Sequence, residues 1–156
     1  MQLKSAAFSH SGKIPSKHTC EGGNVSPALH WEGAPQGTRR FALIMEDPDA
    51  PAGIWCHWIV YDIPADARGL PEQVPPEKYL PDGAVQGRNS FRKTGYGGPC
   101  PPPRHGPHRY FFRLYALDSS LDLPPNAVRD KLLSAMEGHI LGRAELMGIC
   151  ERGGDR

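Results

Sequence analysis

The sequence predicts a mainly β protein with little helix, and two observations lead to this fold class. The 156 residues include 18 glycines and 17 prolines, which interrupt the chain too often for long helices. The segments richest in aromatic and branched side chains are short and bounded by Pro or Gly, which is typical of strands. No internal repeat or linker divides the chain, so residues 1–156 are expected to form a single domain.

Three segments are predicted to be strands and to centre the core: 40–46, 56–63 and 109–117. Side chains alternate along a strand, so each segment should present one row to a common face. These rows are Phe41, Leu43, Met45 and Asp47; Trp55, His57, Ile59 and Tyr61; and His108, Tyr110, Phe112 and Leu114. Residues 68–81 contain four prolines and are expected to form a long surface loop.

One helix is predicted after Pro124-Pro125. Asn126 is a suitable N-cap, and Val128, Leu132 and Met136 follow at helical spacing with Gly138 just past the end. Residues 139–151 fit either a strand or a helix, because two glycines weaken a helix and the apolar pattern does not decide between them.

Composition excludes several classes of function. The charges nearly balance, with 18 Lys and Arg against 17 Asp and Glu, and no basic block interleaves with aromatics, so a nucleic-acid partner is not expected. The longest apolar run, residues 41–45, is too short to span a bilayer, so no integral membrane protein is predicted. No signal-like apolar run follows Met1, which favours the cytoplasm.

The four cysteines, Cys20, Cys56, Cys100 and Cys150, are widely spaced and contain no C-x-x-C pair. This spacing is not that of a zinc knuckle or a redox pair, so four reduced thiols are predicted. The chain also lacks a phosphate-binding glycine loop, a dinucleotide fingerprint and a G-x-S-x-G nucleophile motif. No cofactor is therefore expected.

Three motifs carry the candidate site. Asp47-Pro48-Asp49-Ala50-Pro51 presents two carboxylates on a backbone that two prolines restrict, although Asp and Pro are also ordinary turn residues. His57 lies in an aromatic strand, where a hydrogen-bonded core histidine is the more common role.

The third motif is a Gly- and Pro-rich run over residues 95–103, followed by His105, His108 and Tyr110. Glycines let backbone N–H groups approach an anion, although the run is also compatible with a plain irregular loop. His105 and His108 could join Asp47 and Asp49 around a metal, but an H-x-x-H pair in a loop fixes neither ring, and no metal is predicted.

Taken together, these motifs resemble the phosphatidylethanolamine-binding protein family, over roughly residues 8 to 150. The resemblance rests on ordered blocks: Cys20-Glu21-Gly22, Asn24-Val25-Ser26-Pro27, Trp31, the Asp47–Pro51 and Trp55–Trp58 blocks, Gly98-Pro99 with Pro101-Pro102, Gly106–Tyr110, Tyr115–Leu117, Ala135–His139 and Ala144–Leu146. The blocks nearest the two ends look like the bacterial and archaeal branch of the family.

The resemblance implies an antiparallel β-sandwich with one or two short helices and makes the segment from His139 a strand. It also implies a small anion pocket lined by Asp47, Pro51, Trp55, His57, Gly98, Pro99, His108 and Tyr110, to which Asp49 is added from its motif. Its ligands would be phosphate, carboxylate or phospholipid head groups. Two alternatives stay open: inhibition of a kinase or protease through protein contact, and weak phosphoester hydrolysis.

Two further expectations concern assembly and backbone. The bacterial branch implies a homodimer, and pairing would also cover exposed sheet in a chain with little apolar content. The short stretch between Asp47 and Trp55 must reverse the chain, and both this geometry and the resemblance predict a cis peptide bond at Ala50-Pro51.

Overall fold

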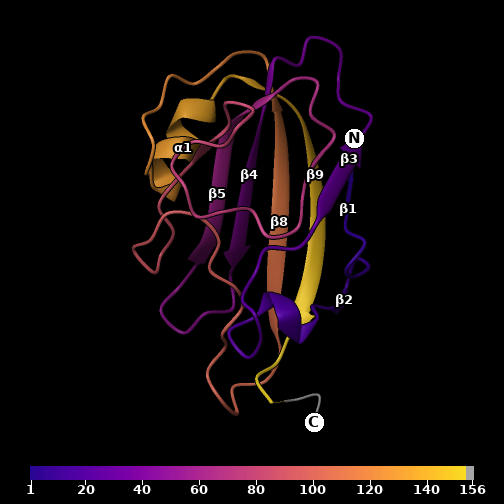
Figure 1. Cartoon of the computed structure of the whole chain (residues 1–156), viewed down its shortest axis with the longest axis vertical. Coiled ribbons are helices and arrows are strands. Elements are labelled where there is room, and N and C mark those ends of the chain that lie inside the picture. Colours follow the sequence, from indigo (N-terminus) through magenta and orange to yellow (C-terminus); the bar gives the residue numbers. More distant parts are fainter. Residues whose placement is uncertain (154–156) are drawn as a thin grey trace.

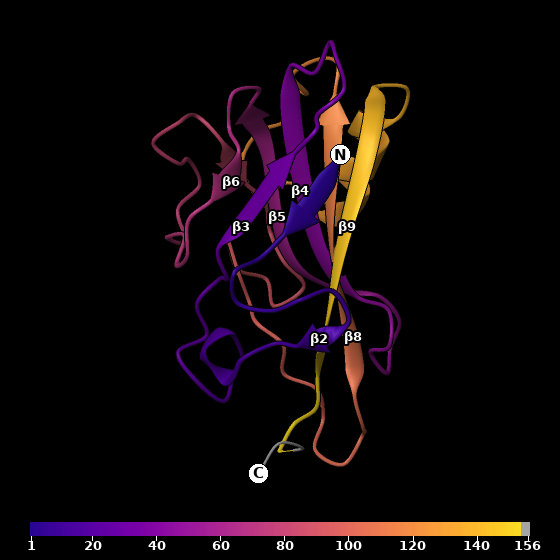
Figure 2. The same ribbon diagram turned by 90° about the vertical axis from the view of Figure 1, so that its right-hand side faces the viewer.

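The computed structural model describes residues 1–153, which form three layers: a small sheet, a large sheet and one helix (Figures 1 and 2). The small sheet has the order β1-β3-β6, and the large sheet has the order β2-β9-β8-β4-β5-β7. The elements are β1 (Gln2–Lys4), β2 (Gly12–Lys13), η1 (Ser16–His18), β3 (Leu29–Glu32), β4 (Arg40–Asp47), β5 (Trp55–Pro64), β6 (Gly69–Leu70), β7 (Val85–Gln86), β8 (His108–Leu117), α1 (Arg129–Met136) and β9 (Ile140–Cys150).

The mainly β prediction is confirmed, and the three predicted strands are β4, β5 and β8, neighbours in the large sheet. All strand pairs are antiparallel except β2 with β9, where two residues of each strand run parallel. The 68–81 segment is mainly loop, as predicted, but Gly69–Leu70 adds the edge strand β6 to the small sheet.

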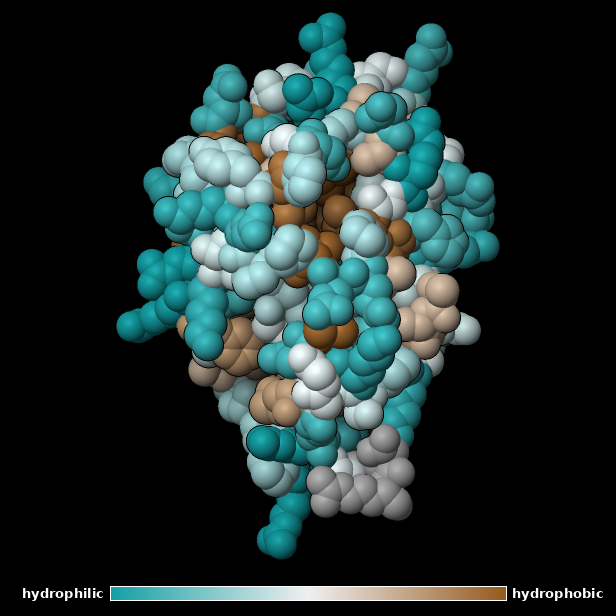
Figure 3. All heavy atoms as spheres, viewed as in Figure 1, coloured by the Kyte–Doolittle hydropathy of each residue, from teal (hydrophilic) through white to brown (hydrophobic). Residues whose placement is uncertain are grey.

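Two apolar clusters follow from the alternation of side chains along the large sheet. The first lies between the two sheets and includes Phe41, Leu43 and Met45 of β4 with Phe112 and Leu114 of β8. The second lies on the opposite face, where Leu132 and Met136 of α1 pack over alternate residues of the same strands. The face viewed in Figure 3 is mostly hydrophilic, with apolar residues showing in its upper centre.

A β-bulge interrupts the alternation in β5. Met45 pairs with Trp58 and Glu46 pairs with Cys56, so His57 is an extra residue on β5. Cys56 therefore belongs to the cluster beneath α1, whereas Trp58 belongs to the cluster between the sheets. The prediction that His57 shares a face with Ile59 and Tyr61 is wrong. The extra residue shifts the alternation by one, so the side chains that follow it point to the opposite faces from those predicted.

Helix α1 begins at Arg129, three residues later than the predicted N-cap Asn126. Asn126 has a left-handed backbone (φ 67°), and its N–H donates to the carbonyl of Gln86 (3.1 Å). A residue in that conformation cannot begin a helix, and Val128 occupies the N-cap position without a side-chain hydrogen bond. Gly138 follows the helix with φ 82°, as its position predicts.

The segment after His139 is a strand, as the resemblance implies. β9 pairs with β8 along almost its whole length, from Ile140 opposite Leu117 to Cys150 opposite His108. Its glycines allow close packing, because a Cβ on Gly148 would lie 2.5 Å from the Ile14 side chain. Glycine here marks contact with the neighbouring layer and does not end the strand.

The prediction of four free thiols is wrong. Cys20 and Cys100, 80 residues apart, form a disulfide with a Cα–Cα distance of 5.3 Å. Two further contacts hold the same segments together: the Cys20 N–H donates to the Pro99 carbonyl (3.0 Å), and the Tyr96 hydroxyl donates to the His18 carbonyl (2.7 Å). The sequence shows no sign of a bridge whose two ends meet only through tertiary packing.

Cys56 and Cys150 are free and buried. Burial raises the pKa of the Cys56 thiol to about 12 and that of Cys150 to about 11, so both stay protonated and unreactive. Disulfides are rare in the reducing cytosol, so this bridge gives no support to the cytoplasmic location that the sequence predicts. None of the helices within residues 1–153 has the length and apolar character needed to cross a membrane.

The predicted cis bond at Ala50-Pro51 is also wrong, since every peptide bond in the described part of the chain is trans. The reversal between β4 and β5 is made by a turn in which the Gly53 N–H donates to the Ala50 carbonyl (3.1 Å). Gly53 adopts φ 110°, a conformation that glycine reaches without strain, so no cis bond is needed.

Candidate functional site

A small cavity of about 180 Å³ lies where β4 ends and where β5 and β8 begin, toward the lower end of the large sheet in Figure 1. Strand ends and the loops that follow them meet here, so polar groups carried by three strands are brought to one place. The lining residues are Asp47, Ala50, Pro51, Trp55, His57, Phe91, Cys100, Pro101, Pro102, His108 and Tyr110. We call this the strand-end cavity.

Asp47 is buried and held by two hydrogen bonds. Its Oδ1 accepts from the Asp49 N–H (2.7 Å), and its Oδ2 lies 2.7 Å from Nδ1 of the buried His108. The Nδ1 of His108 is the donor, because a carboxylate can only accept. Nε2 of His108 lies 2.5 Å from Nδ1 of the exposed His105. A hydrogen-bonded chain thus runs from a buried carboxylate to the surface of the 98–107 loop.

His57 is the extra residue of the β5 bulge. Its Nδ1 lies 2.6 Å from the Gly97 carbonyl, to which it donates, and its ring meets Tyr110 and Phe91 edge-on. Burial lowers the pKa of His57, with partial opposition from the Gly97 bond and the Asp47 charge, so the ring is neutral at neutral pH.

The second nitrogen of His57 faces the cavity. Nε2 has no hydrogen-bond partner within residues 1–153. Every fully buried side-chain N or O atom in that part of the chain has a partner, so Nε2 is not fully buried. Nε2 must therefore be reached through the cavity that His57 lines. Since Nδ1 carries the proton, Nε2 of the neutral ring is an acceptor, and it becomes a donor only when the ring is protonated.

Tyr110 completes the polar lining. Burial raises the pKa of its phenol, as do the charge of the nearby Asp47 carboxylate and a hydrogen bond to it, so the hydroxyl stays protonated beside that carboxylate. With His57 neutral, the cavity offers a phenol donor, an imidazole acceptor and a carboxylate paired with His108. Trp55, Phe91 and the prolines supply apolar walls.

Six of the nine predicted site residues line the cavity: Asp47, Pro51, Trp55, His57, His108 and Tyr110. Asp49 does not. Its carboxylate turns outward and pairs with Arg109 through Nε (3.0 Å) and Nη2 (2.9 Å), and also accepts from the Arg109 N–H. The bond to Arg109 lowers the pKa of Asp49 to about 2.

Gly98 and Pro99 do not line the cavity, although they directly precede the lining residues Cys100, Pro101 and Pro102. The Gly98 N–H donates to Oδ1 of Asn24 (2.9 Å), and a Cβ on Gly98 would lie 2.3 Å from the carbonyl oxygen of His18. Both residues fix the segment that carries Cys100, Pro101 and Pro102 into the cavity. Those three residues could have been inferred from their place in the same Pro-rich run, and Ala50 from its place within the Asp47–Pro51 motif, whereas Phe91 carries no comparable signal.

The metal alternative finds no support in the geometry. Within residues 1–153, no three His, Cys, Asp or Glu side chains are arranged to hold an ion. His105 and His108 contact each other directly, and Asp49 is occupied by Arg109.

Comparisons with known proteins agree with the fold. A UPF0098 protein of Methanothermobacter thermautotrophicus is 54% identical over 153 residues, covering 98% of this chain and all of that one. A UPF0098 protein of Aquifex aeolicus is 47% identical, covering 97% and 89%. The crystal structure of Escherichia coli YbcL, described as a member of the mammalian PEBP family, superimposes with a TM-score of 0.89 at 36% identity, covering 96% and 97%.

A phosphatidylethanolamine-binding protein homologue from Chlamydia trachomatis superimposes with a TM-score of 0.87 at 41% identity, covering 96% of each chain. The antiparallel β-sandwich that the sequence resemblance implied is thus the fold of this protein. The profile described as phosphatidylethanolamine-binding protein matches residues 4–151. The chain therefore belongs to the phosphatidylethanolamine-binding protein family.

Proposed function

We propose that this protein binds a small phosphate-type anion in the strand-end cavity and takes it up together with a proton. The observation that carries the proposal is the convergence of His57, His108 and Asp47, all buried, on a cavity whose other walls, apart from the Tyr110 hydroxyl, are mainly apolar. Buried polar groups are costly unless they are paired, and His57 keeps one ring nitrogen unpaired toward the cavity.

The electrostatics define which form of the ligand can bind. Asp47 would repel an anion, and the charge of a protonated His108 would be offset by Asp47. Binding therefore requires a proton on His57 or on the ligand itself, as in a phosphate monoanion. Because burial lowers the pKa of His57, its proton is present only at acidic pH, and affinity should rise as the pH falls below 6.5.

The size of the cavity limits the affinity. About 180 Å³ suits a phosphate group and a short substituent. A group of about five heavy atoms gains at most about 1.5 kcal/mol per atom, so bare phosphate should bind no tighter than micromolar. This range is that of a recognition site for a head group or a phosphorylated small molecule.

The test is an NMR titration of ¹⁵N-labelled protein with phosphorylethanolamine at pH 6 and pH 8. We expect amide shifts around residues 47–57 and 108–110 at pH 6 and weaker binding at pH 8. His57→Ala should abolish these shifts, whereas His30→Ala, which removes an exposed histidine of β3, should leave them unchanged. Equal affinity in the wild type and His57→Ala would refute the site. Release of inorganic phosphate during the titration would instead favour the hydrolase alternative.

A further inference from the structure

A second cavity, of about 460 Å³, lies on the opposite face of the large sheet, beside α1 and above β8 and β9. Figure 2 shows α1 on the side of the large sheet away from β1 and β3. The residues that line it are Glu46, Arg113, Tyr115, Arg129, Arg143, Ala144 and Glu145. We call it the arginine cavity, because three of these side chains are guanidinium groups.

Glu46 holds two of the arginines in place. The Glu46 side chain is 3% exposed, and its two carboxylate oxygens accept from Arg113 and from Nε of Arg129 (2.6 Å). Arg113 also donates from Nε to Glu145 (3.2 Å). A guanidinium has five N–H donors, so each arginine keeps donors that these bonds do not use. The buried carboxylate thus fixes two guanidinium groups at the cavity without consuming all of their donors.

Arg143 and Tyr115 supply the remaining polar groups. The two residues face each other across β9 and β8. No hydrogen bond or ion pair engages the Arg143 guanidinium within residues 1–153, although Arg113 and Arg129 are both paired there. The Tyr115 side chain is 9% exposed, and burial raises the pKa of its hydroxyl, which therefore remains a donor. Both groups border the same cavity.

The charges leave one positive charge uncompensated. Among the lining residues, three arginines face two carboxylates, those of Glu46 and Glu145. Arg129 also lies 3.6 Å from the highly exposed Asp130, which is outside the lining, whereas Arg143 has no partner among the described residues. Several donors converge on one space, which favours a group with three acceptor oxygens over a carboxylate with two oxygens. A volume of about 460 Å³ lies within the range of small-molecule sites, so there is room for more than the anionic group.

We propose that the arginine cavity is a second binding site, which takes the phosphate group of a small organic phosphate. This inference is independent of the strand-end cavity, which lies on the other face of the sheet. Glu46 and Asp47 are consecutive on β4 and contribute to opposite sites. The two sites also differ in their pH dependence, because guanidinium groups stay charged at every pH where the protein is folded.

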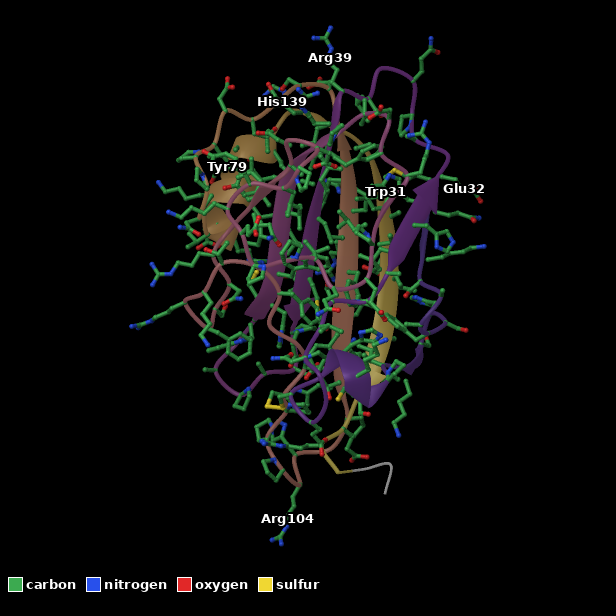
Figure 4. All side chains as sticks on the ribbon, in the orientation of Figure 1. Trp31, Glu32, Arg39, Tyr79, Arg104 and His139 are labelled. Carbon is green, nitrogen blue, oxygen red and sulfur yellow. A yellow bond between two sulfur atoms is a disulfide. The ribbon has the colours of Figure 1, made fainter. Side chains whose placement is uncertain are left out.

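The experiment is an NMR titration with phenyl phosphate at pH 8, where His57 is neutral and the phosphate is a dianion. Arg143→Gln removes the unpaired guanidinium from an exposed position and should not disturb folding. Arg104→Gln makes the same charge change at the lower tip of the molecule, far from the cavity (Figure 4). Benzoate serves as the carboxylate comparison.

We expect amide shifts centred on residues 113–115 and 143–145, and an affinity at least about fivefold weaker in Arg143→Gln, because a charge-assisted hydrogen bond is lost. Arg104→Gln should match the wild type, and benzoate should bind more weakly than phenyl phosphate. Equal affinity in Arg143→Gln and the wild type would overturn the proposal. Loss of the pH 8 binding in His57→Ala but not in Arg143→Gln would overturn it too, since the phosphate would then lie in the strand-end cavity.

Discussion

Reduction of the Cys20–Cys100 disulfide should lower the free energy of unfolding by a large and measurable amount. The bridge closes a loop of 80 residues, which restricts the unfolded chain far more than the folded one. The chain-entropy relation gives about 4.5 kcal/mol for a loop of this length at 25 °C, and measured losses for native disulfides are about 2–5 kcal/mol. The free energy of unfolding of a typical domain is about 5–15 kcal/mol, so the disulfide contributes a large share of it.

The native fold should survive reduction at 25 °C. Segments on both sides of the bridge stay joined by the Cys20 N–H to the Pro99 carbonyl, by Gly98 to Asn24 and by the Tyr96 hydroxyl to the His18 carbonyl. We therefore expect an amide spectrum that changes around residues 20 and 100 and stays the same elsewhere.

Urea unfolding with and without dithiothreitol measures the difference. The wild type should lose about 2–4.5 kcal/mol on reduction. A Cys20→Ala/Cys100→Ala double variant should match the reduced protein and should not respond to dithiothreitol. Thiol titration in denaturant should count two thiols before reduction, Cys56 and Cys150, and four after it. Four thiols in freshly purified, unreduced protein, or no change in stability on reduction, would refute the reasoning.

Three further predictions follow from single side chains. Gln86→Leu should lower the free energy of unfolding, measured by urea unfolding, by about 2 kcal/mol or more. The substitution would leave three polar groups without a hydrogen-bond partner: the buried Trp58 Nε1–H, which lies 2.8 Å from Gln86 Oε1, and two backbone carbonyls that accept from the Gln86 amide. Gly98→Ala should cost about 1–3 kcal/mol by the same assay, since its Cβ would lie 2.3 Å from the carbonyl oxygen that ends η1, and no loss would mean that this loop yields easily. The pKa of Asp49 is lowered, so its pairing with Arg109 stabilises the fold above about pH 4, and this stabilisation is lost as the pH falls toward about 2. In thermal unfolding, the difference in stability between the wild type and Asp49→Asn should therefore disappear over that pH range.

Local patterns in the sequence predicted the elements whose structure is set locally. The rows Phe41, Leu43, Met45 and Tyr110, Phe112, Leu114 were correctly assigned to one face, because side-chain alternation is a property of each strand alone. Gly138 correctly predicted the end of α1, because the left-handed conformation after a helix is also set by the local backbone. The motifs that supply most of the lining of the strand-end cavity could be predicted to lie together, because prolines and glycines concentrate where strands end and loops converge.

Apart from the cis bond predicted at Ala50-Pro51, which a local turn at Gly53 makes unnecessary, the following errors concern contacts between distant segments. Asn126 resembles an N-cap, but its N–H bonds to Gln86 and its side chain accepts from Thr94, so tertiary contacts hold it outside the helix. The Cys20–Cys100 bridge depends on the docking of the η1 loop against the segment around Gly98. Asp49 was grouped with the site because it adjoins Asp47, yet Arg109 on another strand turns it away.

The bulge at His57 determines which groups reach each face of the sheet. Without the extra residue, His57 would occupy the position on β5 that pairs with β4 and alternation would place Cys56 and Trp58 on one face. With it, Cys56 packs beneath α1, Trp58 reaches the core between the sheets, and His57 turns into the strand-end cavity beside Tyr110. On β4, the same irregularity lies at Met45 and Glu46, just before Asp47. Ordinary alternation along β4 places the consecutive carboxylates of Glu46 and Asp47 on opposite faces, one at each cavity. The partners of each carboxylate then decide its role. Two arginines leave Glu46 in a site whose lining carries more positive than negative charge, whereas His108 and a backbone N–H leave Asp47 in a site that can accept an anion only together with a proton.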